Sequence, residues 1–338
     1  MRCRWCVGFS CEVNAKNGTQ NTVIPRALTT GNCELKTDCM TKEILTDGRG
    51  HVTGVAYFDE NNHLHEQPAD LVVVSCGANE SARLLLNSKS RIFPAGLGNR
   101  YDWVGRNLQG HAYTGAVGLF DSDVYDDVGP GASIAICDFN HHNPGLVSGG
   151  MLANEFIRLP IELVGRTPPG TKAWGREHKD FMRQWFKRSS IIMGPVQEMP
   201  VFEARVTVDP AVKDYWGVPV CRLSGGRHAN DIHVAEFLSR KAEAWLKESG
   251  AAQTWPQLPG PGLSGGQHQA GTCRMGNDPK TSVVNKDCQV HDVDNFFVID
   301  ASVHVTNGGF NPVLTIMANA YRASANLIQN WKGTKFRG

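Results

Sequence analysis

The chain has 338 residues, with 34 Lys and Arg residues against 33 Asp and Glu residues and a formal net charge of +1. This balance gives no electrostatic reason to expect a nucleic acid or an anionic membrane as a partner. The length allows one large or two ordinary domains, and no apolar run approaches the roughly 20 residues needed to cross a bilayer.

Ten cysteines are spread irregularly along the chain, which does not suggest a small disulfide scaffold. Cys3, Cys6 and Cys11 have the spacing C-x2-C-x4-C, but no fourth Cys or His lies nearby to complete a zinc or iron–sulfur site. We therefore predict structural thiols and no metal, with a metal-binding module as the weaker alternative. Most other cysteines, such as Cys76 and Cys137, are expected to be buried free thiols.

Residues 33–87 predict a run of strands followed by a helix. Gly48 to Gly50 and Asn61-Asn62 are turn signals between strands. The predicted strands are residues 33–47, 52–59, 63–67 and 70–75. The last is apolar throughout, as in a buried sheet, and it leads through Cys76-Gly77-Ala78 into a predicted helix at 79–87. Ligands of open α/β sheets bind at such a strand end.

Residues 112–257 have a different composition. Alternating apolar and polar residues at 113–120, 133–139 and 201–209 predict antiparallel strands, separated by loops rich in Asp, Gly and Pro. A helix is predicted from about Asn230 to Glu248, with Gly250 as a stop signal. We expect its apolar side to carry Ile232, Phe237, Leu238 and Trp245.

The segment from Gly265 to Ala320 combines features of a ligand site. His268 lies in a glycine-rich stretch, where the backbone can approach a ligand closely. Phe296 to Ile299 is predicted as a buried strand, followed by Asp300 and a Thr-Asn-Gly-Gly turn. Asn311 as N-cap and Pro312 at the first helical position then open an amphipathic helix. The positive end of this helix dipole would face whatever lies beyond the strand.

Three motifs in this order resemble a known family. The stretches HQAGTCRMG, VIDAS and NPVLTIMA are similar to the C-terminal signature of the glucose-methanol-choline (GMC) flavoprotein oxidoreductases, within the branch of gluconate 2-dehydrogenase-like and pyranose oxidase-like enzymes. The resemblance implies an α/β fold, with an incomplete FAD-binding domain and an α+β substrate domain built on an antiparallel sheet. The implied segments are 1–111 and 258–338 for the FAD-binding domain and 112–257 for the substrate domain.

A dinucleotide fingerprint is missing from these segments. The literal G-x-G-x-x-G match at 260–265 has no leading strand, no following helix and several prolines, so we predict a loop. In the resembled family the fingerprint precedes any segment similar to residues 1–16. We therefore expect this chain to be the C-terminal part of a family member, either shortened or one piece of a split enzyme. Any export signal would lie upstream of Met1, which leaves the compartment, cytoplasm or periplasm, open.

The resemblance also assigns residues to the chemistry. It implies that His268 is the general base facing the flavin, and that Asn311 is the second member of the catalytic pair. An imidazole suits proton removal at neutral pH, whereas an amide only orients the hydroxyl. The residues implied to lie along the FAD are Gly77, Ala78, Asn107, Asp300, Ala301, Asn311 and Pro312.

Simpler roles stay open for several of these residues. Asn311 can be a plain helix N-cap, and Asp300 a strand-end turn residue. His111 is the last residue of the motif VGRNLQGH, and the sequence leaves a role near the flavin open for it. Arg274 and Met275 are expected to support the His268 loop, and Met40 is either an adenine contact or a core residue. The remaining histidines of interest are expected on the surface or in loops: His141, His142, His291 and His304.

The resemblance implies FAD-dependent oxidation of a hydroxyl group in a sugar, sugar acid, polyol or glycoside. Hydride would pass to the flavin, and electrons would leave for oxygen or for an acceptor protein or small subunit. The alternative is an inactive or partial chain that needs the missing ADP-binding segment.

Overall fold

The structure is a computed structural model that describes residues 11–125, 134–155, 159–264 and 266–331. The chain divides into two compact units. The first comprises the described residues of Met1–Thr37, Tyr113–Pro195 and His233–Pro259, and the second those of Asp38–Ala112, Val196–Ile232 and Gly260–Gly338. The predicted substrate segment 112–257 thus falls mainly in the first unit, while its residues 196–232 belong to the second.

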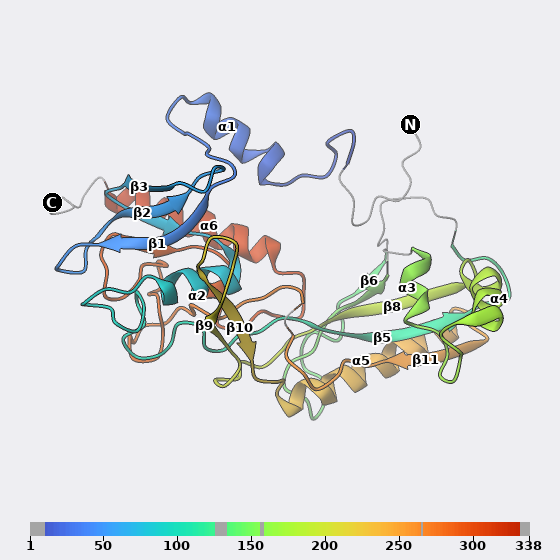
Figure 1. The fold of residues 1–338 in the computed structure, drawn as a ribbon. Helices are drawn as coiled ribbons and strands as arrows, with labels where there is room; N and C mark the ends of the chain where they lie inside the picture. Colours follow the sequence, from blue (N-terminus) through green and yellow to red (C-terminus); the bar gives the residue numbers. More distant parts are fainter. Residues whose placement is uncertain (1–10, 126–133, 156–158, 265, 332–338) are drawn as a thin grey trace. The chain divides into compact units, whose positions relative to one another are not determined.

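A three-stranded antiparallel sheet opens the second unit (Figure 1). It consists of β1 (Met40–Thr46), β2 (Val52–Phe58) and β3 (Leu64–Pro68), paired in the order β1-β2-β3. Asp47 closes the first turn, because its carboxylate accepts hydrogen bonds from the N–H groups of Arg49 and His51. Asp59 does the same in the second turn for Asn61 and His63. Both predicted turns are therefore present.

A second sheet of this unit has two parallel strands, β4 (Val72–Val74) and β12 (Phe296–Val298). The helix α2 (Gly77–Asn87) follows β4, and the short 3-10 helix η2 (Ala301–Val303) follows β12. The buried side chains of Leu84, Leu85 and Phe296 contribute to one core with these strands. Strand residues 72–74 pair with 296–298 in register, so both strands end at the same edge of the sheet.

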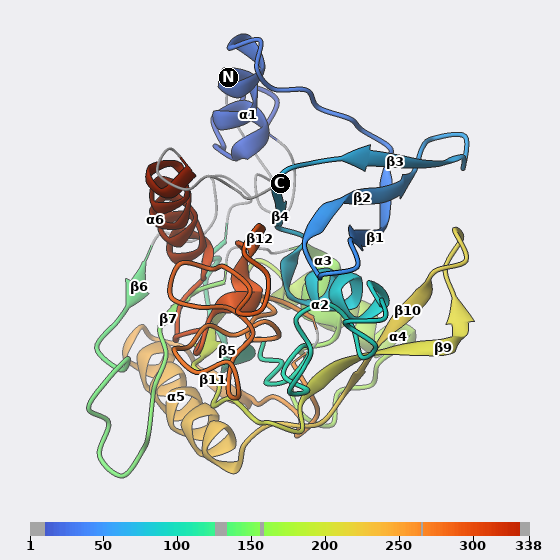
Figure 2. The same cartoon turned by 90° about the vertical axis from the view of Figure 1, so that its left-hand side faces the viewer.

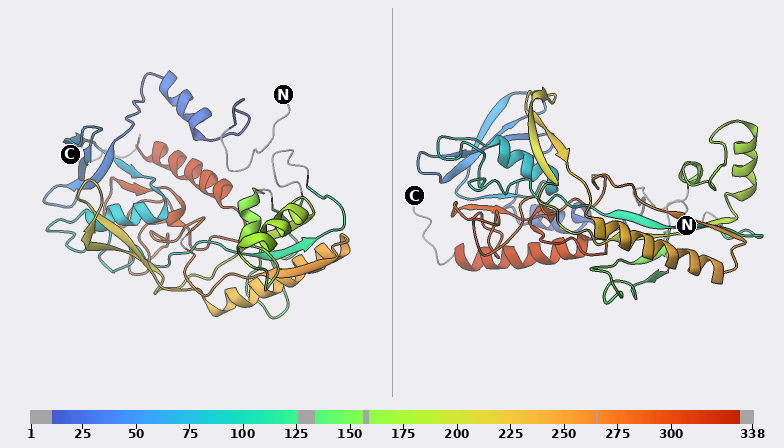
Figure 3. Two further views of the ribbon diagram at one scale, coloured as in Figure 1. Left: turned by 45° about the vertical axis from the view of Figure 1, so that its right-hand side comes forward. Right: turned by 90° about the horizontal axis from the view of Figure 1, so that it is seen from below.

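Three further elements complete the second unit. The strands β9 (Arg205–Lys213) and β10 (Pro219–Ser224) form an antiparallel hairpin, and α2 packs against both of them. The helix α6 (Val313–Trp331) is joined to the unit through Ala323, which is fully buried in the same core. The loops that precede α6 lie between α2 and α6 (Figures 2 and 3).

The first unit is built on a five-stranded antiparallel sheet in the order β11-β5-β8-β7-β6. Its strands are β5 (Ala112–Leu119), β6 (Ala135–Ile136), β7 (Leu152–Asn154), β8 (Ser189–Val196) and β11 (Gln253–Gln257). Its shorter helices are η1 (Thr19–Asn21), α1 (Val23–Thr29), α3 (Pro160–Val164) and α4 (Gly175–Trp185). Side chains of α4, Phe181 and Trp185, pack on a core formed by Val117, Ile191 and Trp255.

The long helix α5 (Ala229–Glu248) lies along β5 (Figure 1). The hydroxyl of Ser239 donates to the Gly115 carbonyl at 2.6 Å, and Thr114 donates to the Ala235 carbonyl at 2.8 Å. The buried face of α5 therefore agrees with the predicted one only at Leu238, because small residues allow the helix to approach the strand closely. Its fully buried apolar residues are Val234, Ala235, Leu238, Ala242 and Leu246, whereas Ile232, Phe237 and Trp245 are half-buried.

The predicted α/β class is confirmed, and three local predictions need correction. The strand predicted at 33–47 begins only at Met40, and α6 begins at Val313, one residue later than expected. Cys76 and Cys137 are exposed rather than buried, because each lies within two residues after the end of a strand. Over the described ranges, no helix is both long and apolar enough to cross a membrane.

Candidate active site

The carboxylate of Asp300 organises the edge where β4 and β12 end. Its Oδ2 atom accepts hydrogen bonds from the Gly77 N–H at 2.9 Å and from the Ser81 hydroxyl at 2.5 Å. Its Oδ1 atom accepts from the Ser302 N–H at 2.7 Å and caps η2. Asp300 thus links the start of α2 to the start of η2, and it brings Gly77, Ala78 and Ala301 to one edge of the sheet.

The segment of the GTCRM motif runs beside these strand ends. The Thr272 hydroxyl donates to the Ala78 carbonyl at 2.6 Å, and the Cys273 N–H donates to the Ser302 carbonyl at 2.8 Å. The Met275 N–H continues the series by donating to the Val303 carbonyl at 2.9 Å. The motif is therefore anchored to the start of α2 and to η2, and support of the His268 loop by Arg274 and Met275 stays a prediction.

The VGRNLQGH segment pairs with the residues that follow His268. Gln109 and Ala270 exchange two backbone hydrogen bonds, at 3.0 and 2.9 Å. Gly271 has a φ of +90°, and a Cβ atom there would lie 2.3 Å from the Asn107 carbonyl oxygen. Only glycine fits this conformation and this close approach. The pairing places His111, which is at the end of the motif, next to His268.

The two imidazoles contact each other directly. The Nδ1 atoms of His111 and His268 are 2.9 Å apart, and the ring planes meet at 76° with centroids 4.9 Å apart. The Nε2 atom of His111 is 2.9 Å from the Gly308 carbonyl oxygen. Burial, followed by the proximity of His268, lowers the pKa of His111 to about 4. Burial also lowers the pKa of His268, so both rings are neutral at pH 7.

The backbone of His268 is held in a left-handed conformation, with a φ of +56°. A non-glycine residue adopts this region only where its surroundings stabilise it. The side-chain amide of Asn307 does so, because it donates to the His268 carbonyl at 2.6 Å and to the Gly110 carbonyl at 3.4 Å.

Asn311 and Pro312 lie just before α6. Pro312 is buried, and its carbonyl accepts the first helical hydrogen bond, from the Ile316 N–H at 2.9 Å. Pro312 is therefore the N-cap of α6, and Asn311 lies one residue before the cap instead of occupying it. The side chain of Asn311 is exposed. In the part of the chain that the structure describes, no hydrogen bond joins Asn311 to His268. The carbonyl oxygen of Gly308, three residues upstream of Asn311, is bonded to His111.

A buried ionic network contacts the backbone of Gly110, the residue before His111, and was not predicted from the sequence. Glu198 accepts hydrogen bonds from the Gly110 N–H at 3.1 Å, from Arg227 Nε at 3.0 Å and from the hydroxyl of Ser264. The side chains of Glu198 and Arg227 are 5% and 10% exposed. No motif marks these residues, because their partners lie far apart in the sequence.

Asp231 lies beside this network and is completely buried. One oxygen accepts the Met199 N–H at 3.0 Å, while Oδ2 has no partner among the described residues. Burial is the main cause that raises the pKa of Asp231 to about 6, and repulsion from Glu198 adds to it.

Three side-chain amides near the strand ends have buried polar atoms without hydrogen-bond partners in the described part of the chain. They are Asn79 Oδ1, Asn107 Nδ2 and Gln109 Oε1. Asn107 and Gln109 are 4% and 1% exposed. Because an unsatisfied buried polar atom costs about 1–3 kcal/mol, these three atoms are candidates for hydrogen bonds to a polar ligand. Gln109 was missed as a candidate although it belongs to the same motif as Asn107.

Other histidines and cysteines depart in part from expectation. His304 lies in a loop directly after η2, as expected, but it is buried, and burial lowers its pKa. His291 bonds to the Ser282 hydroxyl at 2.8 Å, and the adjacent His141 and His142 are exposed as predicted. Cys3 and Cys6 of the weak metal hypothesis lie outside the described residues, as does Gly265 of the rejected glycine match. Within the described ranges, no three potential ligands gather around a metal position.

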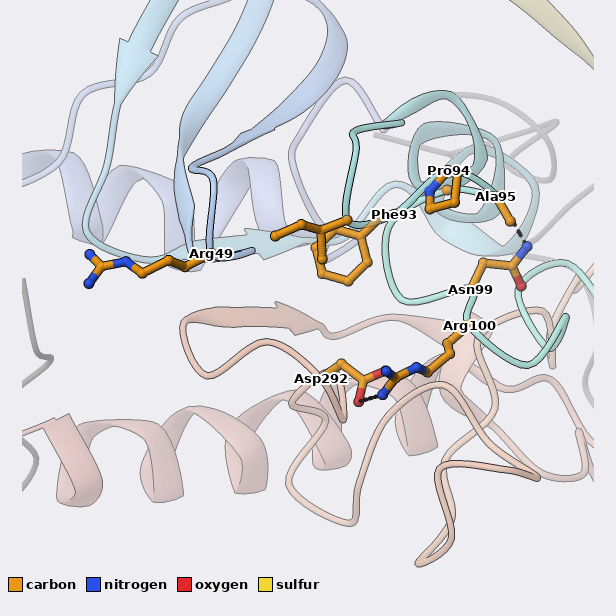
Figure 4. Close-up of a pocket in the computed structure, with 9 residues that line it drawn as sticks. Arg49, Phe93, Pro94, Ala95, Asn99, Arg100 and Asp292 are labelled. Carbon is orange, nitrogen blue, oxygen red and sulfur yellow. Dashed lines mark hydrogen bonds and ion pairs between the residues drawn. The ribbon is translucent and has the colours of Figure 1, made fainter.

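A separate pocket of about 410 Å³ lies on the second unit (Figure 4). Arg100 forms an ion pair with Asp292 at 3.7 Å, and Arg49 forms one with Asp47 at 3.5 Å. Asn99 donates to the Ala95 carbonyl at 3.0 Å, and its Oδ1 accepts the Val104 N–H. These charged and amide groups already have partners in the chain, and none of the predicted site residues lines this pocket.

Comparisons with known proteins agree on one family. Two family models, both described as GMC oxidoreductase, match residues 2–113 and 200–320. The chain is 34% identical over 309 residues to 2-methyl-1,2-propanediol dehydrogenase from Mycolicibacterium austroafricanum, which covers 88% of this chain and 55% of that protein. It is 28% identical over 341 residues to the gluconate 2-dehydrogenase flavoprotein from Pantoea cypripedii, with 94% and 54% covered.

Solved structures show the same fold. Pyridoxine 4-oxidase from Mesorbium loti has a TM-score of 0.58 at 17% identity, over 85% of this chain and 57% of that one. A fungal aryl-alcohol oxidase has a TM-score of 0.52 at 16% identity, over 87% of this chain and 61% of that one. The chain spans about half the length of the curated relatives that it matches.

Proposed function

Because this chain belongs to the GMC oxidoreductase family, we propose that the protein oxidises a hydroxyl group, with FAD as hydride acceptor and His268 as general base. The observation that carries this proposal is the contact between His268 and His111 beside the ends of β4 and β12. A neutral imidazole with a lowered pKa can take the hydroxyl proton at neutral pH.

The residues at the strand ends fit a flavin. Asn107 Nδ2 supplies a donor and Gln109 Oε1 an acceptor, both buried and without partners in the described residues, and a flavin ring presents both acceptors and donors along its edge. Gly77 has a φ of +78°, and a Cβ atom there would meet nothing within 4 Å, so a ligand can approach the start of α2.

The proposed flavin contacts follow from these groups. Asp300 accepts three hydrogen bonds from the chain, while a carboxylate has about four lone-pair sites, so one remains for a flavin hydroxyl. The backbone of Ala301, at the start of η2, is proposed to bind phosphate. The residues proposed to hold FAD are Gly77, Ala78, Asn107, Gln109, Asp300, Ala301, Asn311 and Pro312.

The chemistry divides between cofactor and chain. When bound, the flavin supplies a two-electron acceptor for the hydride that leaves the alcohol carbon. His268 removes the hydroxyl proton, and Asn311 is proposed to orient the same hydroxyl, since an amide does not take up a proton at neutral pH. The lowered pKa of His268 keeps the ring unprotonated and therefore ready to accept the proton.

The proposed substrates are polyols, sugars, sugar acids and glycosides. Relatives named for such donors include the propanediol dehydrogenase and the gluconate dehydrogenase. Paromamine 6'-oxidase from Streptomyces fradiae is a further relative, 28% identical over 323 residues. Two electron acceptors are proposed for the reduced flavin: oxygen, or an acceptor protein or small subunit. Both are kept because these relatives are named as oxidases and as dehydrogenases.

A second candidate is a partial chain that binds flavin only together with a further segment. The half-length coverage of the curated relatives favours keeping it. One experiment addresses both: the purified chain is titrated with FAD, and flavin fluorescence is followed, before and after a panel of polyols and sugars is added. Binding and bleaching by an alcohol support the first candidate. If FAD binds only after a family-type sequence is added upstream, the second candidate is supported. If no alcohol bleaches the flavin even in that longer protein, the proposed reaction is contradicted.

A further inference from the structure

The hydrogen-bond partners of His111 determine which of its ring nitrogens carries the proton. Its Nε2 atom lies 2.9 Å from the carbonyl oxygen of Gly308. A carbonyl oxygen only accepts hydrogen bonds, so the bond exists only if Nε2 of His111 is protonated. The neutral ring then has its lone pair on Nδ1.

The same reasoning extends to His268. Nδ1 of His111 is an acceptor, and the atom facing it at 2.9 Å is Nδ1 of His268. Two unprotonated nitrogens do not bond to each other, so Nδ1 of His268 must be the donor. In the neutral ring of His268 the lone pair is then on Nε2. The two hydrogen bonds therefore run in one direction: His268 donates to His111, and His111 donates to the Gly308 carbonyl.

We propose that His111 is a positioning residue that fixes the tautomer of His268 and makes Nε2 of His268 its basic nitrogen. The relevance to catalysis rests on the proposed function, in which His268 is the base. The arrangement is compatible with both charge states of His268. When Nε2 takes up a proton, Nδ1–H still donates to His111, so proton uptake requires no rotation of either ring.

The surroundings hold His111 in this role. His111 is 5% exposed, and the preceding residue is tied to the buried Glu198 carboxylate through the Gly110 N–H at 3.1 Å. Asn307 bridges the Gly110 and His268 carbonyls, so the two ring-bearing segments share one support. A protonated His111 would donate from Nδ1 and reverse the direction of its bond to His268. Burial and the proximity of His268 oppose that state, since they lower the pKa of His111 to about 4.

The test is nuclear magnetic resonance of the chain labelled with ¹⁵N histidine, which needs no flavin. Long-range ¹H–¹⁵N correlations distinguish an imidazole protonated at Nδ1 from one protonated at Nε2. Signals are assigned by loss in the His268→Gln and His111→Gln variants. The expected result at pH 7 is Nδ1–H for His268 and Nε2–H for His111. An Nε2–H pattern for neutral His268 in the unaltered chain would overturn the proposal.

Two variants of His111 separate the tautomer effect from general disruption. His111→Asn keeps an acceptor at the branch point where Nδ1 stood, whereas His111→Leu has none. His268 is expected to stay Nδ1–H in the Asn variant and to shift toward Nε2–H in the Leu variant. An unchanged His268 pattern in the Leu variant contradicts the proposal. The His291 signal, which reports the bond to Ser282, serves as the control for intact folding, and the unaltered chain remains decisive if the Leu variant unfolds.

Activity then gives an independent readout in flavin-loaded protein. His111→Leu is expected to lower turnover about 100-fold through loss of the correct base tautomer, and His111→Asn is expected to restore most of it. If the tautomers are as stated but no alcohol reduces the flavin, the proposed function fails alone. If alcohol is oxidised while His268 carries its proton on Nε2, only the present inference fails.

Discussion

The Asp300 carboxylate accepts a hydrogen bond from the backbone N–H of Gly77 at 2.9 Å, across 223 positions of sequence. This single contact joins Asp300, the second residue after β12, to the first residue of α2. It fixes the relative position of two strand ends that come from distant parts of the chain, and the candidate cofactor residues are grouped around it.

Removing this carboxylate should destabilise the fold. Asp300→Ala leaves the N–H groups of Gly77 and Ser302 and the hydroxyl of Ser81 without their acceptor. We expect the free energy of unfolding to fall by about 3 kcal/mol, measured by urea denaturation. Asp294→Ala, at an exposed aspartate shortly before β12, is the matched control. Equal losses in the two variants would mean that the Asp300 contacts contribute little.

Gly271 should not tolerate a side chain. A Cβ atom there would lie 2.3 Å from the Asn107 carbonyl oxygen, in a backbone with a φ of +90°. Gly271→Ala is expected to lower the free energy of unfolding by about 2 kcal/mol or more and to disturb the His268 loop. Gly266→Ala in the same loop is the control, because nothing lies within 4 Å of its added Cβ. Thermal unfolding of the two variants compares them directly, and an unaffected Gly271→Ala would contradict the described backbone pairing.

Asp231 should make the protein less stable as the pH rises. Its folded pKa is raised to about 6 from 3.8, chiefly by burial and also by Glu198, while the hydrogen bond from the Met199 N–H and the proximity of His228 oppose the shift. Below the unfolded pKa both states are protonated. Between about pH 4 and 6 the unfolded chain loses the proton first, so the free energy of unfolding falls, by about 3 kcal/mol at most.

Asp231→Asn removes this titration. The quantity to compare is the free energy of unfolding of the variant minus that of the unaltered protein. This difference is expected to be about 2 kcal/mol larger at pH 7.5 than at pH 4.5. Denaturant unfolding at both pH values gives the difference, with Asp138→Asn as the exposed control. A stability difference that is the same at both pH values would show that Asp231 does not titrate in this way.

Gln109 should contribute to flavin binding. Its buried Oε1 has no partner in the described residues, while Nε2 donates to the Val305 carbonyl at 3.2 Å. Gln109→Leu is expected to weaken FAD binding about tenfold, the effect of one lost hydrogen bond of about 1.4 kcal/mol. Titration followed by flavin fluorescence measures the affinity. Gln253→Leu, at an exposed position in β11, should leave it unchanged, and equal affinities of the two variants would count against a flavin contact at Gln109.

Local patterns in the sequence predicted much of the fold. The apolar runs at 70–75 and 296–299 contain β4 and β12, and the helices predicted at 79–87 and 230–248 are α2 and α5. These elements follow from hydrophobic periodicity, which depends on neighbours in sequence. The exposure of Cys76 did not follow from it, because exposure depends on where the sheet edge lies.

The candidate site was predictable only where a motif marked it. His268, Asn107 and Asp300 stand in recognisable stretches, and His111 ends one of them. Its contact with His268 spans 157 positions, so no local pattern gives it. The ion pair of Glu198 with Arg227 and the burial of Asp231 also arise from long-range packing. These parts of the candidate site are therefore visible only from the long-range contacts of the structure, and neither periodicity nor a motif predicts them.

The most direct test of the central proposal is the rate of flavin reduction by a polyol in flavin-loaded protein without oxygen. Loss of the visible flavin absorption is followed after rapid mixing, for the unaltered protein and for His268→Ala. We predict that His268→Ala lowers this rate by roughly 10²–10⁴-fold while the flavin stays bound. A near-native rate in the variant would contradict the assignment of His268 as the base.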